Sequence, residues 1–128
     1  MNAQLSEARS SGQRDSPEPI VIAISSDSMG RGDEELGKVL LRNYIHTLTD
    51  MSHKPEVLIF FNSGVTLATE GSPVLADLAA LEDQGVRILL CGTCLAHYDL
   101  KDQVKVGEIS NMYTISETML HAAKVINL

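Results

Sequence analysis

The sequence has no apolar run near the roughly 18 residues that a membrane-spanning helix needs, and its N-terminus has no secretory signal. We therefore expect a cytoplasmic protein with no membrane partner. Cysteine is also scarce, because Cys91 and Cys94 are the only two in the chain. Two cysteines are too few for an extracellular disulfide framework, and a reducing compartment suits them better.

Basic residues are outnumbered, since 10 lysines and arginines stand against 17 aspartates and glutamates and give a net charge of −7. Such a charge argues against nucleic acid as a partner. No G-x-x-x-x-G-K-[ST] sequence is present. Zinc is an open alternative at Cys91, Cys94 and His97 with a distant histidine, but no second ligand pair follows. We expect neither a metal nor a cofactor.

The 128 residues suit one domain. Residues 1–18 are polar, which predicts a disordered tail or linker, and the domain is expected over residues 19–128. Three continuous apolar runs, at 20–24, 57–61 and 86–90, are typical of strands buried on both faces, as in parallel sheets. A weaker pattern predicts further strands at 105–110 and 125–128.

Helices are predicted between these strands. The segment 33–49 carries a stripe of Leu36, Leu40, Tyr44 and Leu48, which Leu41 and Ile45 widen. The segment 73–84 starts with Ser72 as a cap before Pro73. Residues 95–100 suit one or two helical turns, and the spacing of Thr114 and Glu117 predicts a helix over 115–123. The whole order predicts a three-layer α/β/α sandwich with a mainly parallel five-stranded sheet.

Ligands of such sheets bind beyond the carboxyl ends of the strands, so the loop Cys91-Gly92-Thr93-Cys94 draws attention. A helix start lowers the pKa of a thiol, and this spacing lets one sulfur attack the other. The alternative is that both cysteines are small buried apolar residues. His97 is expected at the surface or as a proton donor near the thiols.

Three further segments hold candidate binding residues. Met29 and Arg31 flank Gly30 in a first loop that suits either a phosphate or a plain turn with a charged cap. Asn62 and Ser63 open a second loop, which either contacts an anion or is a turn bounded by glycines. After the fourth strand come Asn111, Met112 and Tyr113, which either wall the thiol pocket or serve core or interface packing.

Four segments, SSDSMGRGDEELG, LIFFNSGVTLATEGSPVL, GVRILLCGTCLAHYDL and GEISNMYTI, together resemble the C-terminal domain of the YedF-type proteins. These are described as sulfurtransferase-like selenium metabolism proteins and belong to the DsrE/DsrF-like superfamily. The resemblance covers about residues 20–127. It implies a parallel five-stranded α/β fold, assembly into dimers, trimers or hexamers, and sulfur relay through a cysteine persulfide.

The resemblance also implies roles for the cysteines. Cys91 matches the sulfur-carrying position of DsrE-like proteins, and Cys94 is the added second thiol of this branch. YedF-type chains usually begin with a TusA-like domain bearing C-P-x-P, and residues 1–19 do not contain that motif. A separate TusA-like carrier or another persulfide donor is therefore the expected partner.

Four functions remain open at this stage. The first is a sulfur or selenium carrier, with enzymatic activity undecided, in which Cys91 accepts the atom and Cys94 resolves the adduct or passes the atom on. The second is a non-catalytic homo-oligomeric binding module with passive cysteines. The third is a dithiol redox protein without sulfur transfer, and the fourth is a nucleotide site at the first loop.

Overall fold

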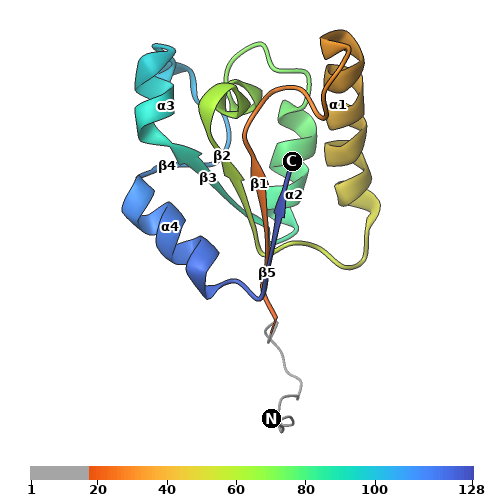
Figure 1. The fold of residues 1–128 in the computed structure, drawn as a ribbon, viewed down its shortest axis with the longest axis vertical. Coiled ribbons are helices and arrows are strands. Elements are labelled where there is room, and N and C mark those ends of the chain that lie inside the picture. The colour runs from red at the N-terminus through yellow and green to blue at the C-terminus, as the bar shows by residue number, and fades with distance from the viewer. Residues whose placement is uncertain (1–17) are drawn as a thin grey trace, which may run out of the picture.

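The structure is a computed structural model that describes residues 18–128, so most of the expected tail lies outside the described residues. Five parallel strands form one sheet in the order β4-β3-β2-β1-β5 (Figure 1). The strands are β1 (Ile20–Ile24), β2 (Val57–Phe60), β3 (Arg87–Cys91), β4 (Glu108–Ser110) and β5 (Lys124–Asn127). The helices are α1 (Glu34–Asp50), α2 (Leu75–Asp83), α3 (Gly92–His97) and α4 (Met112–His121), with short 3-10 helices η1 (Asn62–Ala68) and η2 (Lys101–Gln103).

The sheet lies between two helical layers. Helices α1 and α2 pack together on one side, and α4 lies on the other side (Figure 1). Strand β5 follows β4 in the sequence but joins the opposite edge of the sheet, beside β1, so the connection that contains α4 crosses the sheet in the opposite sense. Strand β2 pairs with β1 through Ile22 and Leu58 and with β3 through Ile88. All four residues of β2 are buried. The predicted α/β architecture with a parallel five-stranded sheet is confirmed.

The buried face of α1 covers only part of the predicted stripe. Gly37, Leu41, Ile45 and Leu48 face the core, whereas Leu36 is 53% exposed and Leu40 is also exposed. Asp33 begins the helix as expected, since its carboxylate accepts from the N–H of Leu36 at 3.2 Å. Apolar residues occupy more of the helix surface than the sheet covers, so their spacing alone did not show which of them are buried.

Helix α2 begins later than predicted. It starts at Leu75, and the Ser72 hydroxyl accepts from the N–H of Val74 at 3.2 Å instead of capping the helix itself. The predicted second loop is also partly wrong, because residues 62–68 form η1. Residues 92–97 are helical, three positions earlier than expected.

Helix α4 begins at Met112, so the predicted capping box at Thr114 and Glu117 is wrong. Asn111 caps the helix, with its side-chain oxygen accepting from the N–H of Thr114 at 2.9 Å. The fourth strand is shorter than predicted, because only Glu108–Ser110 pairs with β3. Gly107, at a φ of 84°, directs the chain into this strand.

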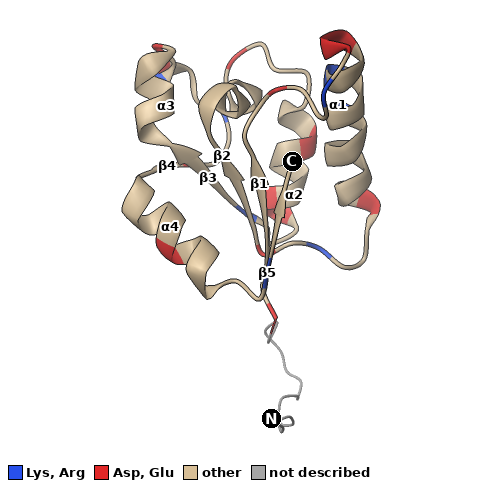
Figure 2. Ribbon diagram, in the orientation of Figure 1, with Lys and Arg blue, Asp and Glu red and all other residues tan. Residues whose placement is uncertain are grey.

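Acidic residues gather at the start of α1 (Figure 2). Arg87 and Glu108 form a two-point ion pair, at 3.0 and 3.3 Å, between β3 and the edge strand β4. No helix within residues 18–128 has the length and apolar character to cross a membrane.

One ion pair links α1 to α2 and makes stability depend on pH. The Asp77 carboxylate lies 3.1 Å from Nδ1 of His46, and this hydrogen bond raises the pKa of the imidazole. A raised pKa stabilises the fold below the ordinary histidine value of about 6.5, and the contribution is lost as the pH rises through the folded pKa. We expect His46→Gln to lower the urea midpoint at acidic pH and to leave it unchanged above neutrality. An equal loss at both pH values would contradict an electrostatic role.

Candidate functional site: two thiols beside a shallow cavity

The two cysteines lie where β3 ends and α3 begins, at the carboxyl edge of the sheet. Cys91 is the last residue of β3 and pairs in register with Ser110 of β4. Gly92 starts α3 directly after it, and a side chain at this glycine would lie 3.0 Å from the backbone oxygen of Ser110. The tight approach of β4 therefore favours glycine between the two thiols.

The two thiols differ in their access to solvent. Cys91 is only 2% exposed and packs in the hydrophobic core. Cys94 lies one helical turn later and is partly exposed. The two thiols are close enough for Cys91 to raise the pKa of Cys94. Solvent therefore reaches the pair through Cys94.

Asn62 holds Cys94 from the neighbouring strand end. Its backbone N–H donates to Sγ of Cys94 at 3.0 Å, and its side-chain oxygen accepts from the hydroxyl of Tyr98 at 2.8 Å. Asn62 has a positive φ of 49°, a conformation that asparagine tolerates better than most residues. This backbone turn aims the N–H at the sulfur.

A cavity of about 300 Å³ opens beside Cys94 and is lined by Asn62, Thr93, Cys94, His97 and Tyr98. The rings of His97 and Tyr98 meet edge to face, with their centroids 5.0 Å apart. The sequence analysis missed Tyr98. The signal was available, because Cys94, His97 and Tyr98 are spaced three and four residues apart and so share one side of a helix.

The electrostatics of Cys94 differ from the sequence expectation. Burial raises the pKa of the Cys94 thiol, and the contact with Cys91 raises it further, although the N–H of Asn62 acts in the opposite direction. The prediction of a lowered pKa is therefore wrong for Cys94. Helix α3, which contains Cys94, is only 6 residues long, so its dipole is small.

This direction predicts slow reaction with alkylating reagents at neutral pH. We expect the iodoacetamide rate at Cys94, followed by peptide mass spectrometry, to reach half its maximum above the ordinary thiol value of about 8.5. An unstructured peptide with the same Cys-x-x-Cys segment is the matched control. A midpoint at or below that of the peptide would contradict the raised pKa.

The structure separates the other predicted site residues. Ser63 accepts from the N–H of Asp27 at 3.3 Å and thereby joins the first and second loops. Asn111 caps α4, while Met112 and Tyr113 are 53% and 77% exposed and do not line the thiol cavity. The expectation that these three residues wall the thiols is wrong, and His97 and Tyr98 take that place.

The first loop folds back on α1 as a turn. Gly30 and Gly32 have φ values of 84° and 124°, and the N–H of Met29 donates to the oxygen of Gly37 at 3.0 Å. Met29 packs against the core, and Arg31 is exposed away from the thiol cavity. Across residues 18–128, no three histidine, cysteine or acidic side chains come together to hold a metal ion.

Comparison with solved structures identifies the fold. The structure matches the ychN protein of E. coli with a TM-score of 0.65 and 24% sequence identity, over 87% of this chain and 99% of that chain. It also matches MTH1491 of Methanobacterium thermoautotrophicum, a protein of unknown function, with a TM-score of 0.63 and 21% identity over 87% and 99% of the two chains. At these identities the likeness concerns the fold alone.

Sequence comparison gives a more specific result. The family model described as the DsrE/DsrF-like family matches residues 22–128, which span the sheet from β1 to β5 and both cysteines. A comparison with curated proteins finds no significant match.

Proposed function

Because the chain belongs to the DsrE/DsrF-like family, we propose that it carries sulfane sulfur, or selenium in the same state, on the Cys91-x-x-Cys94 pair. One observation supports this function most directly: the two thiols are close enough for Cys91 to raise the pKa of Cys94, and Cys94 lines an open cavity. A carrier needs one sulfur that meets the donor and a second thiol within reach of the loaded atom.

We assign the acceptor role to Cys94, in contrast to the order implied by the family resemblance. A donor persulfide on another protein must bring its outer sulfur into contact with the acceptor. At 2% exposure Cys91 offers almost no surface for such a contact, whereas Cys94 faces the cavity. The higher pKa of Cys94 lowers its thiolate fraction at neutral pH but gives a more nucleophilic thiolate.

The proposed transfer is a displacement at sulfur. The Cys94 thiolate attacks the outer sulfur of the donor persulfide, its bond to that sulfur forms, and the donor leaves as a thiolate. The N–H of Asn62, 3.0 Å from Sγ of Cys94, stabilises negative charge on this atom before the attack. In one discharge route, the Cys91 thiolate attacks Sγ of Cys94, which forms a disulfide and releases the carried atom as hydrosulfide or hydroselenide. In the other, an acceptor thiolate takes the outer atom directly.

The cellular setting belongs to the same proposal. The donor is a TusA-like carrier or another protein persulfide, and the reaction takes place in the cytoplasm, where thiols stay reduced. Intact mass after incubation with a sulfane-sulfur donor tests the function, because a loaded protein is one sulfur atom heavier.

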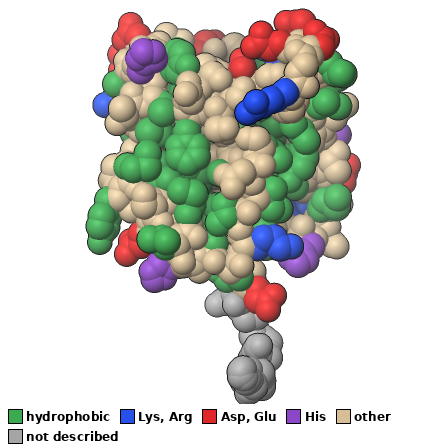
Figure 3. Space-filling model, viewed as in Figure 1, with side chains coloured by type: hydrophobic (Ala, Val, Ile, Leu, Met, Phe, Trp, Pro, Cys, Tyr) green, Lys and Arg blue, Asp and Glu red, His purple; other side chains and the backbone are tan. Residues whose placement is uncertain are grey.

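A second candidate function is an oligomeric binding module with passive thiols. Two observations favour it: the raised pKa of Cys94, and four exposed apolar side chains on β4 and α4. These are Ile109, Met112, Tyr113 and Leu120, of which Leu120 is 84% exposed. Apolar side chains also spread across the middle of the face shown in Figure 3. Contiguous apolar surface of this kind is typical of protein interfaces.

Both candidate functions include a homo-oligomer, and the α4 surface predicts how to break it. We expect the double variant Tyr113→Lys, Leu120→Lys to elute as a monomer in size-exclusion chromatography with light scattering, whereas the unchanged protein forms dimers or larger assemblies. Leu36→Lys, at an exposed leucine of α1, is the matched control and should not alter the assembly. An assembly unaffected by the α4 charges would exclude this surface as the contact.

A further inference from the structure

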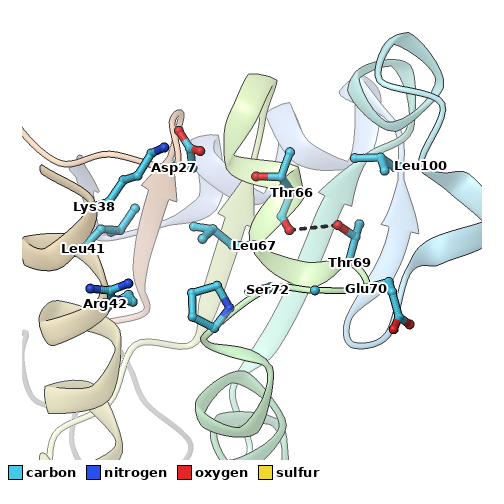
Figure 4. A pocket seen from close by; sticks show the side chains of 12 residues that line it. Asp27, Lys38, Leu41, Arg42, Thr66, Leu67, Thr69, Glu70, Ser72 and Leu100 are labelled. Carbon is cyan, nitrogen blue, oxygen red and sulfur yellow. Dashed lines mark hydrogen bonds between the residues drawn. The ribbon is translucent and has the colours of Figure 1, made fainter. Parts of the chain in front are cut away.

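A second and larger cavity, of about 410 Å³, lies between α1, η1 and the segment that leads into α2. Figure 4 shows Lys38, Leu41 and Arg42 on the α1 wall, with Thr66 and Leu67 of η1 opposite them. Neither cysteine lines this cavity. Its volume is within the range that small-molecule sites occupy.

The charges in this cavity are unequally matched. Glu70 is held by Lys105 at 3.2 Å, and Lys38 lies 3.8 Å from Glu35 and at the same end of the cavity as Asp27 (Figure 4). Arg42 has no ion pair with any residue in the 18–128 range. Arg42 therefore lines this cavity with its charge available to a ligand.

The polar groups near Arg42 fit an anion better than a cation. The Ser72 hydroxyl accepts from the N–H of Val74, so its own hydrogen is available to a ligand. The hydroxyl hydrogens of Thr66 and Thr69 are already donated to backbone oxygens, at 2.7 and 2.9 Å. Donors for a ligand are therefore supplied by Arg42 and Ser72, which both line the cavity.

The remainder of the lining is apolar. Leu41 and Leu67 are buried beneath the cavity, and Pro73 and Leu100 extend its walls. A ligand that matches this lining has one anionic end and a short apolar body. One unpaired cation matches a single negative charge better than two, and a guanidinium binds a carboxylate through two parallel hydrogen bonds.

We propose that this cavity binds a small organic acid, with its carboxylate on Arg42 and the Ser72 hydroxyl and its apolar part over Leu41, Leu67 and Pro73. The site is separate from the thiol pair, so the proposal does not depend on sulfur transfer.

Pentanoate is a suitable probe, and its binding can be followed through backbone amide shifts in two-dimensional NMR. We expect saturable shifts at residues 66–73 and along the first half of α1. Pentanol, which lacks the charge, tests the need for the carboxylate and should not saturate. Butyl phosphate tests the choice of anion and should bind more weakly than pentanoate, since Asp27 lies in the same cavity.

Two arginine variants decide the role of the side chain. Arg42→Gln keeps most of the side-chain length and should weaken pentanoate binding about tenfold or more, as expected for the loss of a charged hydrogen bond. Arg31→Gln removes an equal charge from an exposed position that does not line the cavity, so it should bind pentanoate like the unchanged protein. Thermal unfolding checks that both variants fold.

Three results would overturn the proposal. These are unchanged affinity in Arg42→Gln, equal weakening in both arginine variants, and shifts that centre on the thiol cavity or never saturate. Tighter binding of butyl phosphate than of pentanoate would replace the carboxylate with a phosphate and refute the stated ligand class. Because the assay does not involve the cysteines, a Cys94→Ser protein should give the same pentanoate affinity, whatever the outcome for sulfur transfer.

Discussion

Replacing Cys94 with serine is expected to abolish uptake of sulfane sulfur. After incubation with a persulfide donor, the unchanged protein should gain one sulfur atom in its intact mass under non-reducing conditions, and reductant should remove it. Cys94→Ser should stay at its starting mass, because the remaining thiol, Cys91, is 2% exposed. Serine keeps the size of the side chain and removes the nucleophile, so a loss of loading reports on chemistry rather than on packing.

Cys91→Ser is the matched control for this experiment. It should still load, and it should hold the added sulfur longer, because no neighbouring thiol is left to form a disulfide with Cys94. Loading lost only in Cys91→Ser would keep the carrier function and reverse the assignment of the two thiols. A loss of two hydrogens without added sulfur would point to dithiol redox chemistry. No mass change in the unchanged protein or in either variant would exclude both reactions and favour the binding module with passive thiols.

Gly64→Ala is expected to cause a large loss of stability next to the site. A methyl group at Gly64 would lie 2.4 Å from the backbone oxygen of Ile24, an atom that cannot move without disturbing the end of β1. The contact forces η1 away from the sheet. We expect a loss of about 3 kcal/mol in the free energy of unfolding, measured by urea titration. This is a large part of the roughly 5–15 kcal/mol available to a small domain.

The same variant should also disturb the thiol pair, because Asn62 is the first residue of η1 and its N–H reaches Cys94. Gly71→Ala is the control. Gly71 has a φ of 90° but open space around it, so the change should cost only the backbone strain of about 1–2 kcal/mol and leave Cys94 reactivity unchanged. A Gly64→Ala protein as stable as the unchanged one would mean that η1 does not press on β1.

The sequence patterns predicted the sheet well because three of its strands are buried on both faces. A continuous run such as 57–60 has only one stable environment, the interior of a parallel sheet. The helix ends were less predictable. Thr114 and Glu117 have the spacing of a capping box, but Asn111 caps the helix, because its side-chain oxygen accepts from the N–H of Thr114. The sequence offers two possible caps three residues apart, and which one starts the helix depends on where β4 ends in the fold.

The candidate site was partly predictable. The placement of both cysteines at a strand end followed from the apolar run before them, and the fold confirms that placement. The difference in exposure between Cys91 and Cys94 was not available, because it depends on how α3 turns over the sheet. The role of Tyr98 and the cavity around Arg42 were not predictable either, because both depend on η1. The sequence indicated only a turn bounded by glycines for that segment.

The edge of the sheet at β4 bears on how the protein avoids aggregation. Strand β4 forms this edge with only three residues, and Glu108 places a charge there through its pair with Arg87. So short and charged a border is a poor template for an incoming strand, because fibril growth needs a long run of unpaired amides and carbonyls. This edge of the sheet therefore disfavours open-ended stacking of one sheet onto another.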